Sequence, residues 1–426
     1  MQVAIIGSGV AGLVAGWRLH AHHAVTLFEA DSRIGGHVHT VEVARDATRL
    51  ARPGEADALA VDTGFIVHNP VNYPVLCRIF AELGVATRDT GMSFSVVCER
   101  TGLCWAGRDL STVFAQRRNL LRPRFWGMLR GIARFHAAAR AELLDDGVGA
   151  VDEDLGLGAF LDRHRIPAAT IEHYLVPIGA AIWSAPPEAM RRFPARRFAR
   201  FLHHHGMLSM GDARPQWRTV VGGARTYVEA ITRPWRDRIR TGAPVQRIQR
   251  DAEGVRLHVG GTWQRFDRVV IACHSDTALA MLDDPSDAER AILSAIPYQE
   301  NLAELHTDAR LLPPLRRCWS AWNHRVDGSG KRAIETYWMN ALQGLDSGRR
   351  QLCVSLNAGA RIDPASALMR TTYHHPQFLP GSQRAQAGRT NISGVRGTHY
   401  CGAWWGQGFH EDGAVSGMAA ADEILR

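Results

Sequence analysis

The chain has 426 residues, of which 46% are hydrophobic and 22% charged, and its formal net charge is +8. The length allows two or three domains or one large α/β body with an insertion, and the composition is typical of a packed globular protein. An integral membrane protein is excluded because no apolar run is long enough to cross a bilayer. Seven cysteines without a CxxC pair argue against a disulfide framework or zinc ribbon, so we expect a cytoplasmic, reducing location.

The first elements that the sequence predicts are a strand, a glycine-rich turn, a helix and a second strand, over residues 2–6, 7–12, 13–19 and 25–28. Within the turn, Gly7, Gly9 and Gly12 form GxGxxG, and Glu29 follows the second strand. Gly7 allows the tight turn, Gly9 lets the backbone approach a pyrophosphate, and Gly12 lets the helix pack closely on the strand. With Glu29 placed to accept a hydrogen bond from a ribose hydroxyl, this pattern predicts dinucleotide binding.

The residues after the second strand indicate which dinucleotide is bound. Glu29, Arg33, Gly35 and Gly36 spell ExxxRxGG, which resembles an extension in the superfamily of flavin monoamine oxidases, phytoene desaturases and protoporphyrinogen oxidases. The resemblance implies FAD, with these glycines beside its ribityl-phosphate arm and the turn Thr63–Phe65 near the isoalloxazine. The family usually continues with an arginine, where this chain has His37. His37 and His39 lack a carboxylate or cysteine that would complete a metal site, so no metal is expected.

Two stretches in the middle of the chain are rich in arginine and free of Asp and Glu. Residues 110–141 hold seven arginines among leucines and aromatic residues, and residues 190–211 hold five more among phenylalanines. Such basic faces suit an anionic membrane surface or an acyl carboxylate, although solvated amphipathic surface helices are the plainer interpretation. Nucleic acid is not expected, because no recognised binding motif accompanies the charge. The run His203–His205 is expected at the surface.

Further along, three segments resemble parts of the same superfamily. Residues 220–228 resemble the segment that re-enters the FAD domain, and 244–248, including Val245, the strand beside adenine. Residues 266–273 read as another buried strand. The segments SAWNH and ETYWMN are expected to be strands of a substrate domain.

The C-terminal stretch CGAWWGQGFHEDGAVSGMAAADEIL is expected to complete the site. A strand over 398–401 ends in a tight exit at Gly402 and Ala403, beneath the pyrophosphate, and a last helix covers Val415–Leu425. In the family this helix aims its N-terminus at the flavin N1–C2=O edge, where its dipole stabilises negative charge. His410, Glu411 and Asp412 are candidates for proton handling or substrate positioning, or alternatively for helix capping. Trp404 and Trp405 could form an aromatic cage for an amine or wall an apolar tunnel.

Six fragments narrow the resemblance over essentially the whole chain: GGHVHT, VDTGFIVHN, LHTDARLLPP, TYWMNALQ, YHHP and GFHEDG. Together they resemble a branch of flavin proteins associated with cyclopropane-fatty-acid synthases. This implies an FAD-dependent oxidoreductase that desaturates an unsaturated or methyl-branched fatty acyl chain by hydride transfer to flavin N5. It also implies a methyltransferase-like synthase as a possible partner, with peripheral contact to the inner membrane face.

Two alternatives stay open. One is a flavin amine oxidase acting on a small amine or polyamine, and the other is a non-catalytic FAD-bound partner of a fatty-acid-modifying synthase. Classical amine oxidases of this fold tend to hold a water through a lysine near the flavin, whereas the single lysine here, Lys331, lies in a polar run typical of a loop tip.

The predicted fold is α/β, with a Rossmann-like FAD-binding domain of the amine-oxidase type and a discontinuous α+β substrate domain. The FAD domain is assigned to residues 1–70, 215–285 and 390–426, and the substrate domain to 71–214 and 286–389, with the basic helical insertion at about 110–210. The predicted cofactor-binding residues are Gly7, Gly9, Val10, Ala11, Gly12, Glu29, Ala30, Arg33, Gly35, Gly36, His37, Thr63, Gly64, Phe65, Val245, Gly402, Ala403, Gly413, Ala414 and Val415. The predicted catalytic residues are His410, Glu411, Asp412, Trp404 and Trp405.

Overall fold

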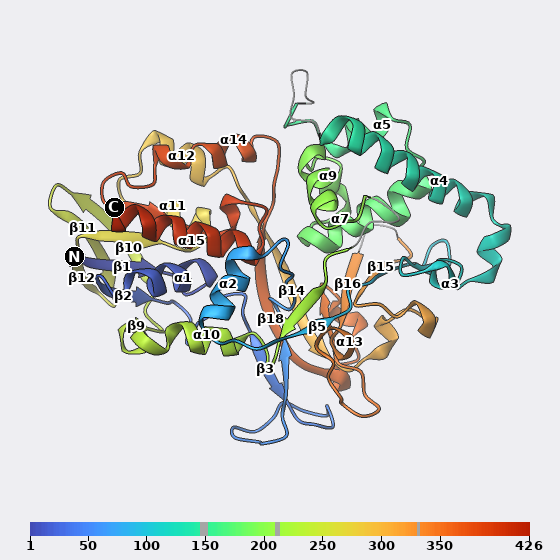
Figure 1. Cartoon of the computed structure of the whole chain (residues 1–426), viewed down its shortest axis with the longest axis horizontal. Coiled ribbons are helices and arrows are strands. Elements are labelled where there is room, and N and C mark those ends of the chain that lie inside the picture. Colours follow the sequence, from blue (N-terminus) through green and yellow to red (C-terminus); the bar gives the residue numbers. More distant parts are fainter. Residues whose placement is uncertain (145–151, 209–213, 330–332) are drawn as a thin grey trace.

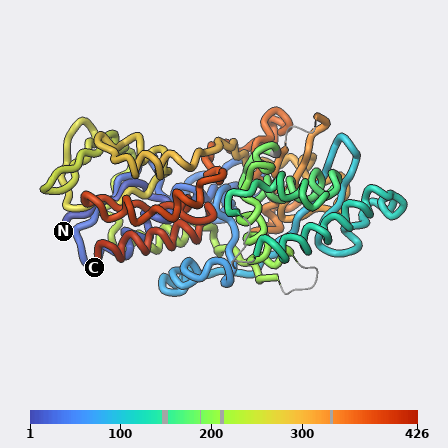
Figure 2. The backbone as a smooth tube through the Cα atoms, turned by 90° about the horizontal axis from the view of Figure 1, so that it is seen from above, coloured from blue at the N-terminus to red at the C-terminus, as the bar shows by residue number. Residues whose placement is uncertain are grey.

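The computed structural model describes residues 1–144, 152–208, 214–329 and 333–426. The molecule is elongated, and both termini lie at the same end of it (Figures 1 and 2). Lys331 lies outside the described residues.

A five-stranded parallel sheet forms the end of the molecule that holds both termini. Its order is β19 (Thr398–Tyr400), β13 (Arg268–Ile271), β1 (Gln2–Ile6), β2 (Ala24–Phe28) and β9 (Ile239–Arg240). These strands come from three distant parts of the chain, all within the ranges assigned to the FAD domain. Their apolar runs are buried, as expected of parallel strands covered on both faces. The predicted α/β fold is confirmed.

Two helices pack against each other beside this sheet: α1 (Val10–Leu19) and α15 (His410–Leu425). A Cβ added to Gly413 would lie 2.5 Å from Val10 Cγ1, and one added to Gly417 would lie 2.3 Å from the Ala11 carbonyl oxygen. Glycine therefore occurs inside α15 because the helices approach closely, which outweighs its low helix propensity. Both helices begin earlier than predicted, α1 at Val10 and α15 at His410, so the His-Glu-Asp run forms the first turn of α15.

Smaller elements surround the parallel sheet. An antiparallel sheet holds β10 (Val245–Asp251), β11 (Gly254–Val259) and β12 (Thr262–Phe266), and the nearby helices are α10 (Arg225–Thr232), α11 (Ser275–Met281), α12 (Asp287–Leu293) and α14 (Ser382–Ala387). Two strand pairs, β3 (Thr40–Val43) with β4 (Leu59–Asp62) and β5 (Thr87–Thr90) with β8 (Trp217–Val220), lie in the connections, together with α2 (Pro74–Glu82).

A seven-stranded mixed sheet forms the centre of the other half (Figure 1). Its order is β18 (Ala367–Pro376), β14 (Tyr298–His306), β17 (Cys353–Leu356), β16 (Ala333–Trp338), β15 (Trp322–Val326), β6 (Phe94–Cys98) and β7 (Leu103–Ala106). Neighbouring strands are antiparallel except β15 and β6. The strands predicted from SAWNH and ETYWMN are β15 and β16, which confirms them, and α13 (Met339–Gln343) follows β16 directly.

Helices cover this second half: α3 (Leu110–Val113), α4 (Pro123–Ala138), α5 (Leu157–Arg163), α6 (Ala168–Thr170), α7 (Val176–Trp183), α8 (Pro187–Met190) and α9 (Ala195–His204). Helix α9 differs from its predicted character. Arg196 and Arg197 are 4% and 5% exposed, Arg196 pairs with Glu153 at 2.9 Å, and Phe198 is fully buried. Helix α9, which forms the middle of the second basic stretch, is thus a core helix, because Arg196 and Arg197 find partners inside the protein, whereas Arg191 and Arg192 before it are exposed.

Candidate active site

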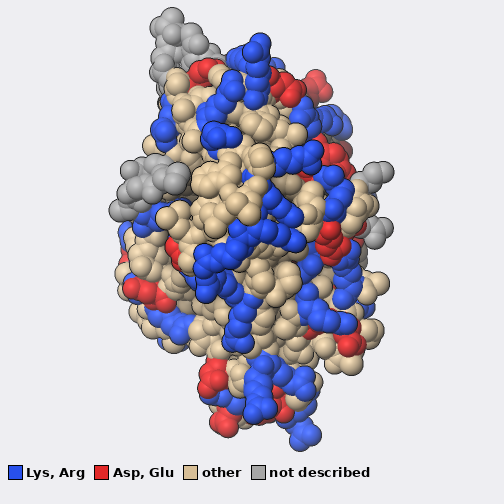
Figure 3. Space-filling model, turned by 90° about the vertical axis from the view of Figure 1, so that its right-hand side faces the viewer, with Lys and Arg blue, Asp and Glu red and all other residues tan. Residues whose placement is uncertain are grey.

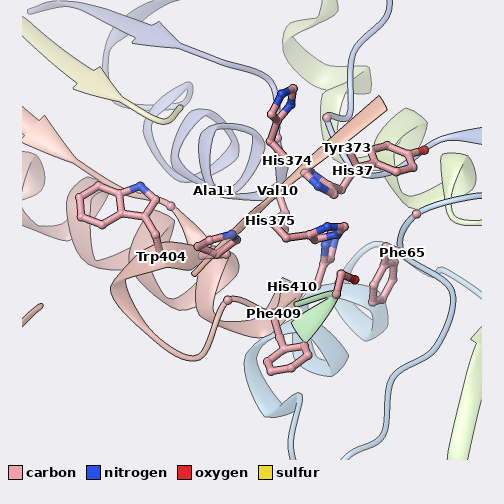
Figure 4. A pocket seen from close by; sticks show the side chains of 18 of the residues that line it. Val10, Ala11, His37, Phe65, Tyr373, His374, His375, Trp404, Phe409 and His410 are labelled. Carbon is pink, nitrogen blue, oxygen red and sulfur yellow. The ribbon is translucent and has the colours of Figure 1, made fainter. Parts of the chain in front are cut away.

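A cavity of about 450 Å³ lies where the parallel sheet meets the seven-stranded sheet. One end is lined by the turns after β1, β13 and β19, and the other by residues from α7, α9, β15 and β16. Segments far apart in the sequence therefore converge on one space (Figure 4). The carboxyl ends of parallel strands are where α/β proteins bind nucleotides.

The nucleotide end of the cavity is built mainly from backbone. Gly7 has φ +101°, and a Cβ there would lie 2.9 Å from the Ala272 carbonyl oxygen, so the turn admits only glycine without strain. A Cβ on Gly12 would lie 2.0 Å from the Gly7 oxygen, whereas a Cβ on Gly9 would meet nothing within 4 Å. The open space in front of Gly9 leaves the N-terminus of α1 free to face an anion such as a pyrophosphate.

Glu29 lines the same end, at the tip of β2. Its Oε2 accepts hydrogen bonds from the Ser8 backbone N–H at 2.8 Å and the Ser8 hydroxyl at 2.5 Å, and its Oε1 accepts one from Asp31 N–H at 2.9 Å. The carboxylate is thereby fixed at the position expected for a ribose contact. Ser8 was missed by sequence reasoning because it occupies a variable position of GxGxxG.

The double-glycine turn is held by Arg33, which donates hydrogen bonds to the Gly36 and Val38 carbonyl oxygens at 2.8 and 3.0 Å. Its role in this structure is to shape the turn that places Gly36 and His37 in the cavity wall. A Cβ on Gly64 would lie 2.0 Å from the His37 carbonyl oxygen, so the turn after β4 passes directly against this one. Thr63, Gly64 and Phe65 also line the cavity, next to the double-glycine turn.

Several predicted contacts lie behind the wall or outside it. Ala30 is exposed, Val245 is buried in β10, and Gly35 shapes the turn. Gly413 and Ala414 pack inside, and Val415 is 46% exposed. Of the residues in α15, His410 is the one that lines the cavity.

A group of histidines faces the middle of the cavity (Figure 4). The His37 ring stacks on Tyr373 with centroids 4.9 Å apart and lies 5.3 Å from the His375 ring. Asn301 Nδ2 donates a hydrogen bond to His375 Nδ1 at 2.9 Å. Burial lowers the pKa of His37 well below its ordinary value and that of His375 to about 4. Where the family usually has an arginine, this chain therefore presents a neutral ring.

His410 lies in the first turn of α15 and is fixed on two sides. Its ring stacks on Phe65, with centroids 3.9 Å apart at 11°, and its Nε2 shares a hydrogen bond of 2.5 Å with the Tyr227 hydroxyl. Burial lowers the pKa of His410 to about 3, so the imidazole is neutral at physiological pH. A neutral, immobilised ring can position a substrate or hydrogen-bond to it.

The two acids that follow His410 hold backbone amides. Glu411 accepts hydrogen bonds from Val75 and Leu76 N–H at 2.8 and 2.9 Å, which caps the first turn of α2. Asp412 accepts one from Phe409 N–H at 2.8 Å. Burial raises the pKa of both carboxyls. The structure thus gives these residues the capping geometry that was the alternative to a role in proton handling.

The rings of the two tryptophans contact each other, with centroids 4.0 Å apart and planes tilted by 31°. Trp404 lines the nucleotide end of the cavity, and its Nε1 donates to the Cys273 carbonyl oxygen at 3.1 Å. A Cβ on Gly402 would lie 2.4 Å from Trp404 Nε1, so the glycine in this exit leaves room for the ring. Trp405 packs against the core behind it.

From the histidines the cavity continues as an arm, which we define by its wall residues. They are Ile66, Val67, Tyr73, Ala181, Ile182, Ser184, Phe201, His205, Trp217, Trp322, Tyr337 and Leu356. Aromatic contacts run along it: Phe409 on Phe201 at 5.1 Å, Phe201 on His205 at 3.8 Å, and His205 on Trp217 at 5.8 Å. His205 thus corrects the prediction of a surface run; the chain turns inward after α9, while His203 and His204 stay exposed.

The arm is electrically neutral. Burial lowers the pKa of His205 to about 4, and the described wall residues of the arm include no Asp, Glu, Lys or Arg. Among the described residues of the whole cavity wall, Glu29 is the one carboxylate, and it lies at the nucleotide end. A charged substrate group would lose its hydration in the arm without gaining a counter-ion, whereas an apolar chain would lose little.

The residues at the nucleotide end fit FAD. Gly7, Gly9, Val10 and Ala11 would receive the pyrophosphate, Glu29 the ribose, and the turns at Gly36–His37 and Thr63–Phe65 the flavin side. The space that the glycines leave open supports this assignment.

Comparisons with known proteins agree with this reading of the fold. The family of flavin containing amine oxidoreductases matches residues 10–307. No curated protein matches the sequence. Among solved structures, putrescine oxidase bound to putrescine superposes with a TM-score of 0.69 at 17% identity, covering 100% of both chains. Cyclohexylamine oxidase from Brevibacterium oxydans IH-35A gives 0.68 at 16%, covering 100% of this chain and 99% of that one. The CLA-producing fatty acid isomerase from P. acnes gives 0.67 at 16%, covering 100% and 98%.

Proposed function

The chain belongs to the family of flavin containing amine oxidoreductases, and from this premise we propose that it is an FAD-dependent oxidoreductase that desaturates a fatty acyl chain. The oxidoreductase activity and the cofactor follow from the family and from the cradle, our name for Gly7, Gly9, Val10, Ala11 and Glu29 at the nucleotide end of the cavity. The acyl substrate is the proposal. The observation that carries it is the neutral, apolar arm that opens from the flavin side of the cavity.

When bound, FAD accepts a hydride from a substrate carbon and passes the electrons to oxygen or another acceptor. The substrate also loses one proton from the neighbouring carbon to a base or a water molecule at the flavin side, and a C=C bond forms between the two carbons. A methylene next to an existing double bond or a methyl branch is the expected target, because an unactivated methylene is a poor hydride donor.

The residues of this chain would hold the substrate and shield the reacting carbons. The aromatic wall from Phe409 to Trp217 would exclude water along the chain. His37, His375 and His410 are unprotonated near neutral pH, so a ring nitrogen left free by Asn301 or Tyr227 can accept a hydrogen bond from the substrate. Their lowered pKa values make these rings weak bases. His410, held by Phe65 and Tyr227, is the best placed to orient it.

The fatty acid isomerase from P. acnes supports the proposal, since it is a protein with this fold that is named for a fatty acid substrate. The expected test is product analysis. Purified holoenzyme incubated with oleoyl and methyl-branched acyl esters should yield products lighter by two hydrogens, located in the chain by mass spectrometry. Unchanged acyl esters together with formation of an aldehyde from putrescine or of cyclohexanone from cyclohexylamine would reverse the ranking.

Amine oxidation is the second candidate, and one observation favours it. A smaller cavity of about 310 Å³ adjoins the arm across Ser184 and Leu356, and Glu335 in its wall could face an ammonium group. Glu335 Oε2 lies 3.0 Å from His324 Nδ1, and burial raises the pKa of this carboxyl. A carboxyl already bonded and inclined to stay protonated is a weak partner for a cation, which is why this candidate ranks second. Binding of a methyltransferase-like synthase stays a prediction for either activity.

A further inference from the structure

The outer edge of the second half of the molecule combines exposed apolar and cationic side chains. This helical edge consists of α3 (Leu110–Val113), a 3₁₀ turn (Arg117–Leu121) and α4 (Pro123–Ala138). It lies at the opposite end from the nucleotide sheet (Figure 1). No described helix is both long enough and apolar enough to cross a bilayer.

Large apolar side chains are unusually exposed along the edge. Leu121 is 88% exposed, Leu110 73%, Leu120 44% and Trp126 40%. The position of Trp126 is fixed, because its Nε1 donates a hydrogen bond to the Leu120 carbonyl oxygen at 2.9 Å and its ring lies 5.4 Å from that of Phe114. Single exposed leucines are ordinary, but a cluster of four within one short segment indicates an interaction site.

Arginines surround this cluster. Arg117, Arg118, Arg124, Arg130 and Arg134 are exposed, and no ion pair joins any of them to a described residue. The sequence from Leu110 to Ala141 contains no Asp or Glu. On the face shown in Figure 3, blue arginine side chains run down the middle over tan atoms, and most of the acidic atoms lie toward the margins. The edge therefore carries a positive field that nothing on it neutralises.

Helix α4 separates its two faces cleanly. Phe125, Met128 and Phe135 are buried against the core, while Trp126, Arg130 and Arg134, at intervals of four, point outward. An amphipathic helix with Trp and Arg on its outer face suits the boundary between headgroups and acyl chains. Trp favours this boundary, and an arginine stem can lie along apolar surface while its guanidinium reaches phosphate.

We propose that the helical edge docks on the surface of an anionic phospholipid bilayer, with Leu110, Leu120, Leu121 and Trp126 inserted between headgroups and the arginines on lipid phosphates. Charge complementarity selects this partner, since an unpaired cationic rim around an apolar patch fits a surface that is negative outside and apolar beneath. Helix α9 shows the contrast, because its arginines are buried or paired inside the protein. The inference is independent of the substrate, and docking and turnover can therefore fail separately.

Vesicle sedimentation of the holoenzyme tests the proposal. The protein should co-sediment with vesicles of phosphatidylcholine and phosphatidylglycerol in equal parts, and not with phosphatidylcholine alone, and binding should weaken as salt increases. Two combined variants should each lower the partition coefficient for anionic vesicles about tenfold or more. One is the double variant L121Q with W126Q, and the other is the triple variant R124Q with R130Q and R134Q. Their flavin absorption should match the wild type, because the edge lies at the opposite end from the nucleotide sheet. The arginine variant should also keep the wild-type melting temperature, since its substituted side chains are exposed, and L121Q alone is measured beside the double variant because W126Q removes the contact with Phe114.

A matched control uses another exposed tryptophan and arginine, in W263Q with R265Q on β12, far from the edge. This variant should sediment like the wild type. Equal binding of wild type and edge variants, or no binding to anionic vesicles, would overturn the proposal. A third outcome would also overturn it: the wild type binds a duplex oligonucleotide but no vesicles, and the edge variants lose the oligonucleotide binding. The edge would then be a nucleic-acid site.

Discussion

The two ends of the cavity are built by different means. The nucleotide end consists of turns whose glycines let backbone approach backbone, such as Gly12 against Gly7 and Gly64 against His37. The arm consists of side chains such as Ile182, Phe201 and Trp322 from elements that lie far apart in the sequence. The first end fits a cofactor shared by the family, and under the proposed function the second would hold the substrate. Substitutions in the two ends should therefore have separable effects.

The largest expected effect separates cofactor binding from folding. In G9V the new side chain enters open space in front of the α1 N-terminus, so the protein should fold but bind FAD at least about tenfold more weakly. The ratio of visible flavin absorption to protein absorption in the purified sample measures this. G91V is the matched control, since Gly91 also has free space and lies in the loop before β6. Equal flavin content in G9V and wild type would contradict the assignment of the cradle.

The next effect concerns the arm alone. I182F adds volume to the wall of α7 that faces the arm, so reduction of the flavin by a long acyl ester should slow on the order of tenfold or more. Flavin content should stay at the wild-type level because Ile182 lies away from the cradle. Anaerobic stopped-flow reduction measures the rate, and the melting temperature controls for overpacking. A variant that loses flavin and keeps its reduction rate would reverse the two roles.

A smaller effect tests the neutrality of the histidines. The folded pKa of His410 is about 3, below its ordinary value of 6.5, so the unfolded chain binds more protons between these values. The contribution of His410 to the free energy of unfolding is therefore complete above about pH 6.5. It falls as the pH decreases, by about 1–2 kcal/mol at about pH 5. In H410Q the fall in unfolding free energy from neutral pH to about pH 5 should be smaller by that amount. The exposed variant H203Q should keep the wild-type slope.

The smallest expected effect distinguishes the two candidate substrates. E335Q retains an acceptor oxygen for His324 and removes the only carboxyl among the described wall residues of the adjoining cavity. For acyl oxidation we expect kcat and KM within about twofold of the wild type, because a neutral substrate does not need the carboxylate. A large rise in KM for amines, with acyl esters inert in both proteins, would favour amine oxidation.

The same contrast explains what the sequence could predict. The cradle depends on local spacing, so GxGxxG, Glu29 and the double glycine are readable over a few dozen residues, and β1 and the approximate positions of α1 and β2 followed from them. The start of α15 was placed too late because Gly413 suggested a helix boundary. The glycine is instead required by contact with Val10, which lies about 400 residues earlier.

The arm could not be predicted, because its residues carry no motif. His205 resembled part of a surface histidine run until the turn after α9 placed it between Phe201 and Trp217. Arg196 and Arg197 resembled a solvated face, and their burial depends on partners such as Glu153 outside that helix. The fragments VDTGFIVHN, SAWNH and ETYWMN do supply wall residues of the arm, among them Val67, Trp322 and Tyr337, but nothing in their sequences indicates that these side chains meet.

The most direct test of the central claim is anaerobic reduction of the bound flavin by two substrates of matched length, an oleoyl ester and oleylamine, followed by visible absorption. The neutral arm predicts that the ester bleaches the flavin band and that the amine, protonated at neutral pH, leaves it unchanged. Rapid bleaching by oleylamine with no response to the ester would contradict the account.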